Sequence, residues 1–389
     1  MKVVDLAVIG AGLSGCSLLA RVHQLGVQGS MAVVEAGRGP GGRTATRRRR
    51  DDQTWRLDHG APGFNVRAPG NSGVEAILAP LRASGTLKRE WGLFKGLDHN
   101  GRLVEVSEEK LLEGEWLRGH PTMASVCEGL LEQASSRLKR LYGCRIRRLK
   151  KTSSGWELSD EQGAVVLMAK QLVLSGTLLA HPRSLSMLAW PDIPLREAVP
   201  IGDDPRLDAA LDVLENSSAS IRWNLMLEIK GLRDQKLPRQ IWLTPKAKER
   251  WQVERLVFQE QPGSVWGVVV HGLDDGSTIT PDRQPALMAQ QEERIRLLLP
   301  DLIRQIPGLG GMSGDDLKPL SLGMMRWGAA QPMDHPLPED LQWCPASGIG
   351  FCGDWIEGPG FGRAEGALLS SVALAEQLAA SHSMSKPVI

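Results

Sequence analysis

The sequence lacks long apolar stretches and contains little cysteine. A membrane-spanning helix needs about 18 or more consecutive apolar residues, and no such run occurs in the 389 residues. The five cysteines are odd in number, scattered and without CxxC spacing, which suits a reducing compartment and predicts no metal site. The N-terminal residues form no apolar signal region. We therefore expect a cytoplasmic protein that does not enter a membrane.

An excess of charge of either sign is also absent. Lys and Arg number 46 against 45 Asp and Glu, so the net charge is +1. Composition therefore gives no reason to expect nucleic acid or an anionic membrane as a partner. Residues 47–50 are four consecutive arginines followed by two aspartates. We interpret this run as a solvated loop, and the alternative is an electrostatic funnel for an anionic substrate.

Tyrosine and phenylalanine are scarce, with one and five residues, whereas there are twelve tryptophans. Several of these, including Trp223, Trp242 and Trp266, fall in stretches that alternate like strands. We expect most of them to pack in the core, and a minority to line a flat substrate cavity.

The N-terminal residues contain the most informative pattern. An apolar run at 6–9 leads into a glycine-rich turn at 10–15, a helix-like stretch follows, and a second apolar run at 31–34 ends in Glu35. This is the order of a dinucleotide-binding βαβ unit. Gly10 permits the tight turn, Gly12 lets a pyrophosphate approach the backbone, and Gly15 lets the helix pack closely on the sheet.

Glu35 lies where a carboxylate accepts hydrogen bonds from both hydroxyls of an adenosine ribose. It would repel a 2′-phosphate, so a ribose without that phosphate is expected. The helix N-terminus presents unpaired N–H groups to the phosphates. The cofactor-binding residues predicted from this unit are Gly10, Ala11, Gly12, Leu13, Ser14, Gly15, Glu35 and Ala36.

The next residues indicate which dinucleotide binds. The sequence GGRTATRR at 41–48 and the sequence DHGA at 58–61 follow the βαβ unit. This wording resembles the flavin amine oxidase superfamily, and within it the bacterial renalase-like flavoproteins. The resemblance implies non-covalent FAD, with Arg43 over the pyrophosphate. It also places Gly42, Thr44, Gly60 and Ala61 at the cofactor.

The resemblance returns near the C-terminus. The stretch IGFCGDW at 349–355 precedes AEGALLSS at 364–371. In the family such a Gly-Asp binds the ribityl chain and the following helix faces the flavin, where negative charge is stabilised by a helix N-terminus. The resemblance therefore adds cofactor-binding residues, namely Ile146 and Ser175 from two returning strands and Gly353, Asp354, Glu365, Gly366 and Ala367. Glu365 could alternatively only cap its helix.

The substrate side departs from the family pattern. Pro62 and Gly63 replace the usual Gln and aromatic residue, and Met325 replaces the usual His before Arg-Trp. Arg326 and Trp327 are the predicted substrate-side catalytic residues, a cation and a flat wall, with packing at a domain interface as the alternative. His59 is interpreted as structural.

These motifs predict an α/β protein. A discontinuous Rossmann-type FAD-binding domain takes residues 1–70, 136–180 and 345–389, because its motifs must meet at one FAD. Residues 71–135 are a predicted insertion with helices at 74–81 and 123–131 and an alternating stretch, 87–116, with a hairpin at 100–101. Residues 181–344 are a substrate domain with a mixed or antiparallel sheet, including strands at 220–229, 240–244 and 264–270, covered by helices such as 285–302.

The resemblance implies an FAD-dependent oxidoreductase that accepts a hydride at flavin N5 from a small molecule of the dihydronicotinamide type. The alternatives are oxidation of a primary or secondary amine, and a flavin-holding scaffold with little turnover. Hydride transfer needs orientation and a dry site more than an acid–base pair. The sequence leaves the substrate, the electron acceptor and the oligomeric state open.

Overall fold

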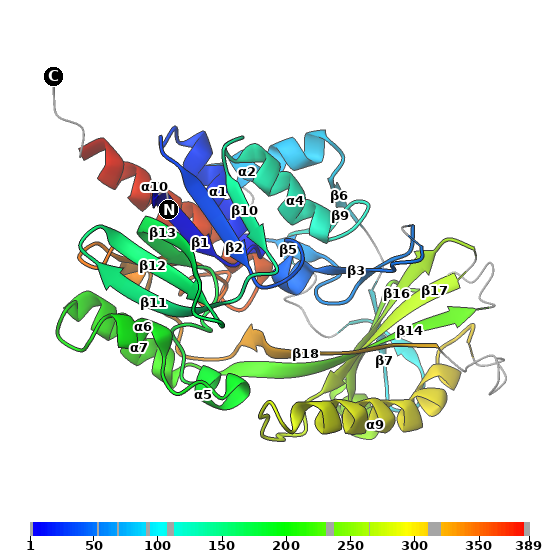
Figure 1. Cartoon of the computed structure of the whole chain (residues 1–389). Coiled ribbons are helices and arrows are strands. Elements are labelled where there is room, and N and C mark those ends of the chain that lie inside the picture. The colour runs from blue at the N-terminus through cyan, green and yellow to red at the C-terminus, as the bar shows by residue number, and fades with distance from the viewer. Residues whose placement is uncertain are drawn as a thin grey trace.

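The computed structural model describes residues 3–52, 54–67, 70–90, 94–106, 113–230, 237–263, 265–309 and 320–384. The expected strand 264–270, the alternating stretch 87–116 and most of the expected domain ranges therefore include some residues outside the described ones. The chain builds two large sheets. One carries helices on both faces, and the other lies beside it with the long helix α9 (Gln284–Arg304) against it (Figure 1).

The first sheet is the predicted dinucleotide-binding sheet. Its strand order is β10-β2-β1-β13-β12-β11, with β20 beside β13 and β19 beside β20. Strands β10, β2, β1, β13 and β20 run parallel to one another. Strand β12 pairs antiparallel with β13, and β11 pairs antiparallel with β12. The strands are β1 (Val3–Ile9), β2 (Met31–Glu35), β10 (Lys139–Tyr142), β11 (Ile146–Thr152), β12 (Gly155–Asp160), β13 (Val165–Leu174), β19 (Trp343–Cys344) and β20 (Ile349–Phe351).

Helices cover both faces of this sheet because its parallel strands are apolar on both sides. Leu18, Leu130 and Leu374 belong to one core, and Leu195 and Leu207 belong to the core on the opposite face. The first face carries α1 (Leu13–Gln24), α2 (Ser72–Ala83), α4 (Ala124–Gln133) and α10 (Ala364–Met384), and the second carries α6 (Pro194–Ala198) and α7 (Pro205–Asn216). The predicted α1, α2 and α4 are confirmed.

The second sheet is mostly antiparallel, with the order β18-β14-β17-β16-β15-β7-β8, and only β15 and β7 pair parallel. The strands at 220–229 and 240–244, predicted from alternation, and the helix at 285–302, predicted from helical periodicity, are confirmed. The strands are β7 (Phe94–Leu97), β8 (Leu103–Val104), β14 (Ala219–Lys230), β15 (Gln240–Leu243), β16 (Val253–Gln261), β17 (Val265–Leu273) and β18 (Leu320–Pro332). Helix α8 (Pro245–Trp251) and α9 pack against it.

Segment 71–135 contributes to both halves of the molecule, the first half built on the sheet that contains β1 and the second half on the sheet that contains β14. Helices α2 and α4 pack with α1 in the first core, whereas the hairpin of β7 and β8 extends the second sheet. Between them a small sheet forms from β5 (Phe64–Val66), β6 (Leu87–Arg89) and β9 (Glu115–Gly119). Short helix α5 (Arg183–Leu188) lies where the chain leaves the first half.

A hairpin from the first half packs on the second sheet. It is formed by β3 (Thr46–Arg48) and β4 (Arg56–Asp58). Its side chains Trp55 and Leu57 form a buried cluster with apolar residues of the sheet. Gly267 makes room for this contact, because a Cβ there would lie 2.7 Å from Cδ1 of Leu57.

Two glutamine side chains of β16 hold the backbone of β4. Gln259 accepts the N–H of Asp58 at 2.9 Å and donates to its carbonyl at 2.8 Å. Gln261 does the same for Arg56, at 3.0 and 2.7 Å. Because the two glutamines and the two backbone residues are each two positions apart, the amides extend the hydrogen bonding of the sheet onto the hairpin.

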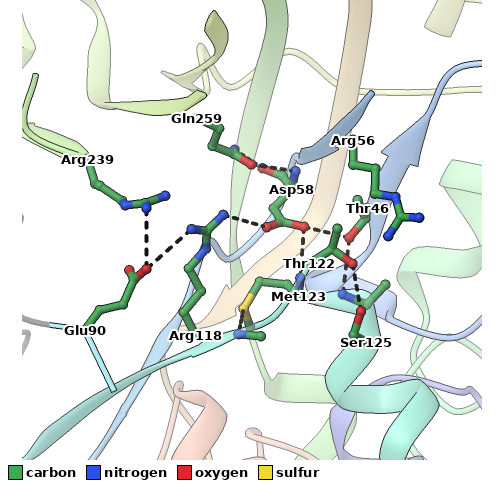
Figure 2. Close-up of polar contacts among 12 residues, drawn as sticks. Thr46, Arg56, Asp58, Glu90, Arg118, Thr122, Met123, Ser125, Arg239 and Gln259 are labelled. Atoms are coloured by element: carbon green, nitrogen blue, oxygen red, sulfur yellow. Dashed lines mark hydrogen bonds and ion pairs between the residues drawn. The ribbon is translucent and has the colours of Figure 1, made fainter. Parts of the chain in front are cut away.

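The carboxylate of Asp58 ties the same strand to the first half (Figure 2). It accepts from the hydroxyl of Thr46 at 2.6 Å and from the N–H of Met123 at 3.0 Å, and Arg118 lies 3.7 Å away. Burial raises the pKa of Asp58, although these three partners oppose the rise. Strand β4 is thus held from both sides, directly before the segment 59–61.

Replacing Gln259 by leucine should lower the free energy of unfolding by about 2–4 kcal/mol. The change keeps the volume but leaves the N–H and carbonyl of Asp58 unpaired in a buried interface, at about 1–3 kcal/mol for each group. Denaturant unfolding measures the loss. The exposed Gln28, which bonds only the nearby carbonyl of Gly26, provides the matched control Gln28→Leu. An equal effect of both substitutions would contradict the role of Gln259.

Candidate functional site

One large cavity of about 790 Å³ runs between the two halves. Its lining includes residues from the glycine-rich turn, from the end of β2, from the segment 41–44 and from the N-terminal part of α10. Its far wall comes from β14 to β18 of the second sheet. The predicted cofactor residues that line it are Gly10, Gly12, Leu13, Ser14, Glu35, Ala36, Gly42, Arg43, Thr44, Gly60, Ala61, Ile146, Ser175, Asp354 and Ala367.

The glycine turn leaves its open side toward the cavity. A Cβ on Gly10, where φ is +102°, would meet Oγ of Ser175 at 2.3 Å, and a Cβ on Gly15 would meet the carbonyl of Gly10 at 2.2 Å. Gly12, by contrast, has only Cα of Gly42 nearby, at 3.8 Å. Gly12 is also the N-cap of α1 and offers no side chain to the first-turn N–H groups. A phosphate can therefore approach these groups.

Two polar side chains fix the turn. The Glu35 carboxylate accepts from the N–H of Ala11 at 2.8 Å and from the N–H of Gly37 at 2.6 Å. The Ser175 hydroxyl lies 3.0 Å from the carbonyls of both Ile9 and Gly10. Ala11 and Gly15 therefore support the turn and do not line the cavity.

Arg43 and Asp354 form a bidentate ion pair that joins the two distant motifs. Both nitrogen–oxygen distances are 2.6 Å, and Arg43 also donates to the carbonyl of Ala330 at 3.1 Å. The Asp354 side chain is only 5 % exposed and that of Arg43 is 39 % exposed, so the bidentate pair is anchored on a buried carboxylate. The sequence motifs assigned separate ligands to the two side chains, and the structure brings them together.

The beginning of α10 faces the cavity through Ala364 and Ala367, whereas Glu365 points elsewhere. The buried Glu365 carboxylate accepts from the N–H of Arg67 at 2.6 Å and from its Nε at 3.1 Å. Gly353 and Gly366 do not line the cavity either. A Cβ on Gly366 would lie 2.3 Å from the carbonyl oxygen of Gly360. These residues shape the helix start and its preceding loop.

A stacked pair borders the cavity at Trp327, which lines it, whereas its partner His59 is not among the lining residues. The rings of His59 and Trp327 are 5.6 Å apart and nearly parallel. Burial, with a contribution from Arg47, lowers the pKa of His59 to about 4, so the ring is neutral near pH 7. The N–H₂ of Asn224 donates to the carbonyl of His59 at 2.8 Å. The segment 59–61 is therefore held by β14 as well as by β4.

Gly63 explains one departure from the family pattern. A Cβ at this position would lie 2.8 Å from Nε1 of Trp116. Trp116 lines the cavity together with Pro62 and Gly63. The glycine therefore makes room for an aromatic wall that comes from a different part of the chain.

The side chains of Arg326 and Trp327 lie on opposite faces of the sheet. Trp327 lines the cavity and is the register partner of Arg222, whereas Arg326 is the partner of Trp223. The Arg326 guanidinium lies 5.6 Å from the Trp223 ring, and Trp223 is buried in the core beneath α9. Arg326 is thus not among the residues that line the cavity, because neighbouring residues of a strand face opposite sides.

The arginine run at 47–50 also lies outside the cavity lining. Arg48 pairs with Glu128 at 2.9 Å and Arg49 pairs with Glu228 at 2.8 Å. Other arginines line the cavity, and sequence reasoning missed them. Arg183 hydrogen-bonds Thr177, and burial together with Arg43 and Arg326 lowers its pKa to about 10.

Sequence reasoning also missed the wall from the second sheet. Trp242, Arg255, His271 and Asn224 come from four different strands and all line the cavity. The alternation along each strand is visible in the sequence, and a polar residue in an otherwise apolar run was the only available signal. The partners of each residue across the sheet depend on strand order, which the sequence pattern does not give.

Among the described residues, no group of three or more His, Cys, Asp or Glu side chains is placed to hold a metal ion. Within the same residues, no helix has the length and apolar character needed to cross a membrane.

Comparison with known proteins supports the cofactor half of the cavity. Residues 8–79 match the family described as an NAD(P)-binding Rossmann-like domain. No curated protein is significantly similar to the chain.

The whole chain has the fold of several solved structures. A putative protoporphyrinogen oxidase from Exiguobacterium sp. 255-15 has a TM-score of 0.65 and 11 % identity, with coverage of 98 % of this chain and 100 % of that one. Wild-type putrescine oxidase bound to putrescine has a TM-score of 0.58 and 14 % identity, with coverage of 97 % and 99 %. The predicted α/β fold, a Rossmann-type domain with a second domain on a mixed sheet, is confirmed.

The neutral His59 gives a testable pH dependence. An unfolded histidine has a pKa near 6.5, so the unfolded state takes up this proton first, and folding stability falls as the pH drops from about 6.5 to about 4. His59→Phe keeps a ring against Trp327 and removes the titration. Its acid-induced loss of stability should be smaller by up to about 3 kcal/mol in that window.

Unfolding by denaturant at several pH values measures this difference. The same substitution at the exposed His99 serves as the control. The remaining acid sensitivity of His59→Phe should come partly from His271, whose pKa burial and nearby arginines also lower. An unchanged pH profile in His59→Phe would rule out a depressed pKa at His59.

Proposed function

We propose that the protein is an FAD-dependent oxidoreductase that acts on a small molecule. The observation that carries this proposal is one cavity whose lining includes both the glycine turn with Glu35 and, from the second sheet, Trp327, against which His59 stacks. An extended dinucleotide has this shape, with an adenosine end and a reactive ring far apart. The fold shared with two kinds of oxidase supports the same class.

The residues present fit FAD. Gly12 and the N-terminus of α1 would receive the pyrophosphate, and Glu35 would accept the adenosine ribose hydroxyls. Ile146 would contact adenine, and the N-terminus of α10 near Ala367 would face the flavin ring. Arg43 and Asp354 would lie beside the chain that links the two halves of the cofactor. When bound, FAD supplies a hydride acceptor.

The protein residues would position the substrate and exclude water. Trp327 provides a flat wall beside Gly60, since a Cβ at Gly60 would lie 3.3 Å from the Trp327 ring. His59 is neutral and buried, so it stacks without adding a charge. Trp116 closes the neighbouring side. Such walls orient a flat ring for hydride transfer without an acid–base pair.

We infer that the substrate is of the dihydronicotinamide type. The lining contains six arginines, at 43, 145, 183, 222, 255 and 363, against four carboxylates, at 35, 254, 334 and 354. An excess of cations favours a ligand with phosphate groups and disfavours a diamine. The second candidate is oxidation of an amine, which the shared fold with putrescine oxidase favours.

The cofactor assignment predicts non-covalent FAD that depends on Glu35. Acid precipitation of the purified yellow protein should release FAD. Glu35→Ala should weaken FAD binding by roughly 10- to 100-fold for each ribose hydrogen bond lost, because a hydrogen bond to a charged group contributes about 1.5–3 kcal/mol. FAD occupancy after dialysis measures the effect, and the surface Glu128→Ala is the control. Flavin left in the precipitate, or full occupancy in Glu35→Ala, would refute the assignment.

The substrate assignment predicts which reductant bleaches the flavin. Under anaerobic conditions, a dihydronicotinamide isomer should bleach the flavin absorbance faster than putrescine or a simple monoamine. Trp327→Leu should slow this step about tenfold or more while FAD stays bound, because a misplaced ring loses near-attack geometry. Fast bleaching by amines alone would give the function to the second candidate. No bleaching by either class would leave a flavin-holding scaffold.

A further inference from the structure

Four residues that line the cavity form one row across the second sheet. Trp242 of β15 is the register partner of Arg255 of β16, Arg255 is the partner of His271 of β17, and His271 is the partner of Asn224 of β14. Side chains at directly opposed positions share one face of a sheet. The row therefore presents four neighbouring side chains to the cavity.

Every member of the row has a buried polar atom without a hydrogen-bond partner among the described residues. These atoms are Nε1 of Trp242, Nε of Arg255, Nε2 of His271 and Oδ1 of Asn224. Buried polar groups are nearly always paired, so each exception calls for an explanation. His271 and Asn224 are only 3 % and 1 % exposed. Other buried atoms of the described residues, such as Nε1 of Trp55, also lack a partner, but these four adjoin one another on one wall of the cavity, which points to a partner supplied by a ligand.

The donors of the row are suited to an oxygen ligand. The indole N–H of Trp242 and the Nε–H of Arg255 are donors only. The Arg255 guanidinium lies 4.5 Å from the Trp242 ring centre, so the two groups are held together. Asn224 uses its N–H₂ group on the carbonyl of His59, which fixes Oδ1 as the free acceptor at the end of the row nearest the segment 59–61.

The charge balance around the row favours an anion. Glu254 is paired with Arg222 at 2.7 Å. Arg255 makes no ion pair with a described carboxylate, and Glu254 is the acidic neighbour that it shares with Arg222. Two guanidinium groups therefore face one carboxylate. Burial and these arginines lower the pKa of His271, so it adds no further charge, and one positive charge remains uncompensated.

The hairpin of β3 and β4 covers the sheet face next to this row but does not cover the row itself. The next row on the same face includes Met226, Val257 and Val269, which pack under Leu57 in a buried apolar cluster. Beyond that cluster the sheet face opens to the cavity. The polar row thus occupies the first uncovered position beside the proposed flavin, and its unpaired atoms are not needed to hold the hairpin.

We propose that the row of Trp242, Arg255, His271 and Asn224 is the subsite that binds an anionic oxygen group of the substrate, a carboxylate or a phosphate. Arg255 and Trp242 donate to the anion, and Oδ1 of Asn224 accepts from an N–H of the same ligand. This inference rests on the proposed function in that the subsite belongs to the same substrate cavity. Because binding itself can be measured, its test does not require turnover.

Calorimetric titration of the purified protein with two matched pairs of ligands tests the subsite. Nicotinate and nicotinamide differ at a carboxylate, and nicotinamide mononucleotide and nicotinamide riboside differ at a phosphate. We expect the anionic member of at least one pair to bind about tenfold or more tightly than its neutral counterpart. The pair that shows the preference identifies the source of the anion. Equal binding within both pairs, or tighter binding of nicotinamide and of nicotinamide riboside than of their anionic counterparts, would overturn the proposal.

Variants connect the preference to the row. Arg255→Gln should abolish the preference for the anion, and Trp242→Phe, which keeps an aromatic ring without its N–H, should reduce it severalfold. Arg48→Gln, at a surface ion pair outside the cavity, should keep it. If Arg255→Gln does not fold, Trp242→Phe decides, and an unchanged preference in that variant would overturn the proposal.

The two proposals fail separately. A colourless protein that still prefers the anion would refute FAD binding and retain the subsite. A yellow protein without any such preference would refute the subsite and leave the flavin proposal intact.

Discussion

The cavity depends on how the strand β4 is held between the two sheets. The amides of Gln259 and Gln261 bond its backbone from the second sheet, while the Asp58 carboxylate bonds Thr46 and Met123 of the first half. Other polar contacts join the halves as well, among them the Asn224–His59 hydrogen bond and the Arg49–Glu228 ion pair, but this double attachment acts on the strand itself. Because the segment 59–61 follows directly, the position of one wall of the cavity is fixed by hydrogen bonds to the other.

The same chain of contacts continues to the cofactor end. The carbonyl of Arg43 accepts from the N–H of Ala61 at 2.8 Å, and a Cβ on Gly60 would lie 2.0 Å from that oxygen. The Arg43 side chain then pairs with Asp354. A displacement of β4 would thus reach Asp354 through two contacts, Ala61 with Arg43 and Arg43 with Asp354. Hydride transfer depends strongly on geometry, so a rigid link between the substrate wall and the cofactor motifs suits the proposed chemistry.

The sequence was informative where the determinants are local. The first βαβ unit is contiguous, so apolar runs, glycine spacing and Glu35 predicted β1, α1 and β2 and the residues that line that end of the cavity. The strands of the second sheet were also predicted from their alternation. The pairing of Arg43 with Asp354, 311 positions apart, could not be predicted, because each motif pointed to a separate ligand.

Residues that face each other across strands were harder still. Arg326 and Trp327 looked like one functional unit because they are adjacent in the sequence, yet strand geometry separates them onto two faces. Trp242, Arg255, His271 and Asn224 looked unrelated because 13 to 47 positions along the chain separate them, yet register aligns them. A sequence pattern reports the period of a strand and not its neighbours, and the neighbours decide which side chains share a site.

The row also has a cost that bears on its interpretation. A buried polar group without a partner costs about 1–3 kcal/mol, a large fraction of the stability of a typical domain. Apolar residues such as those in the next row would remove this cost at once. Residues that lower the stability of the folded state persist mainly where function requires them. Four such atoms side by side in one row, on a part of this sheet face that the hairpin leaves open to the cavity, are therefore best explained by a ligand that pairs them.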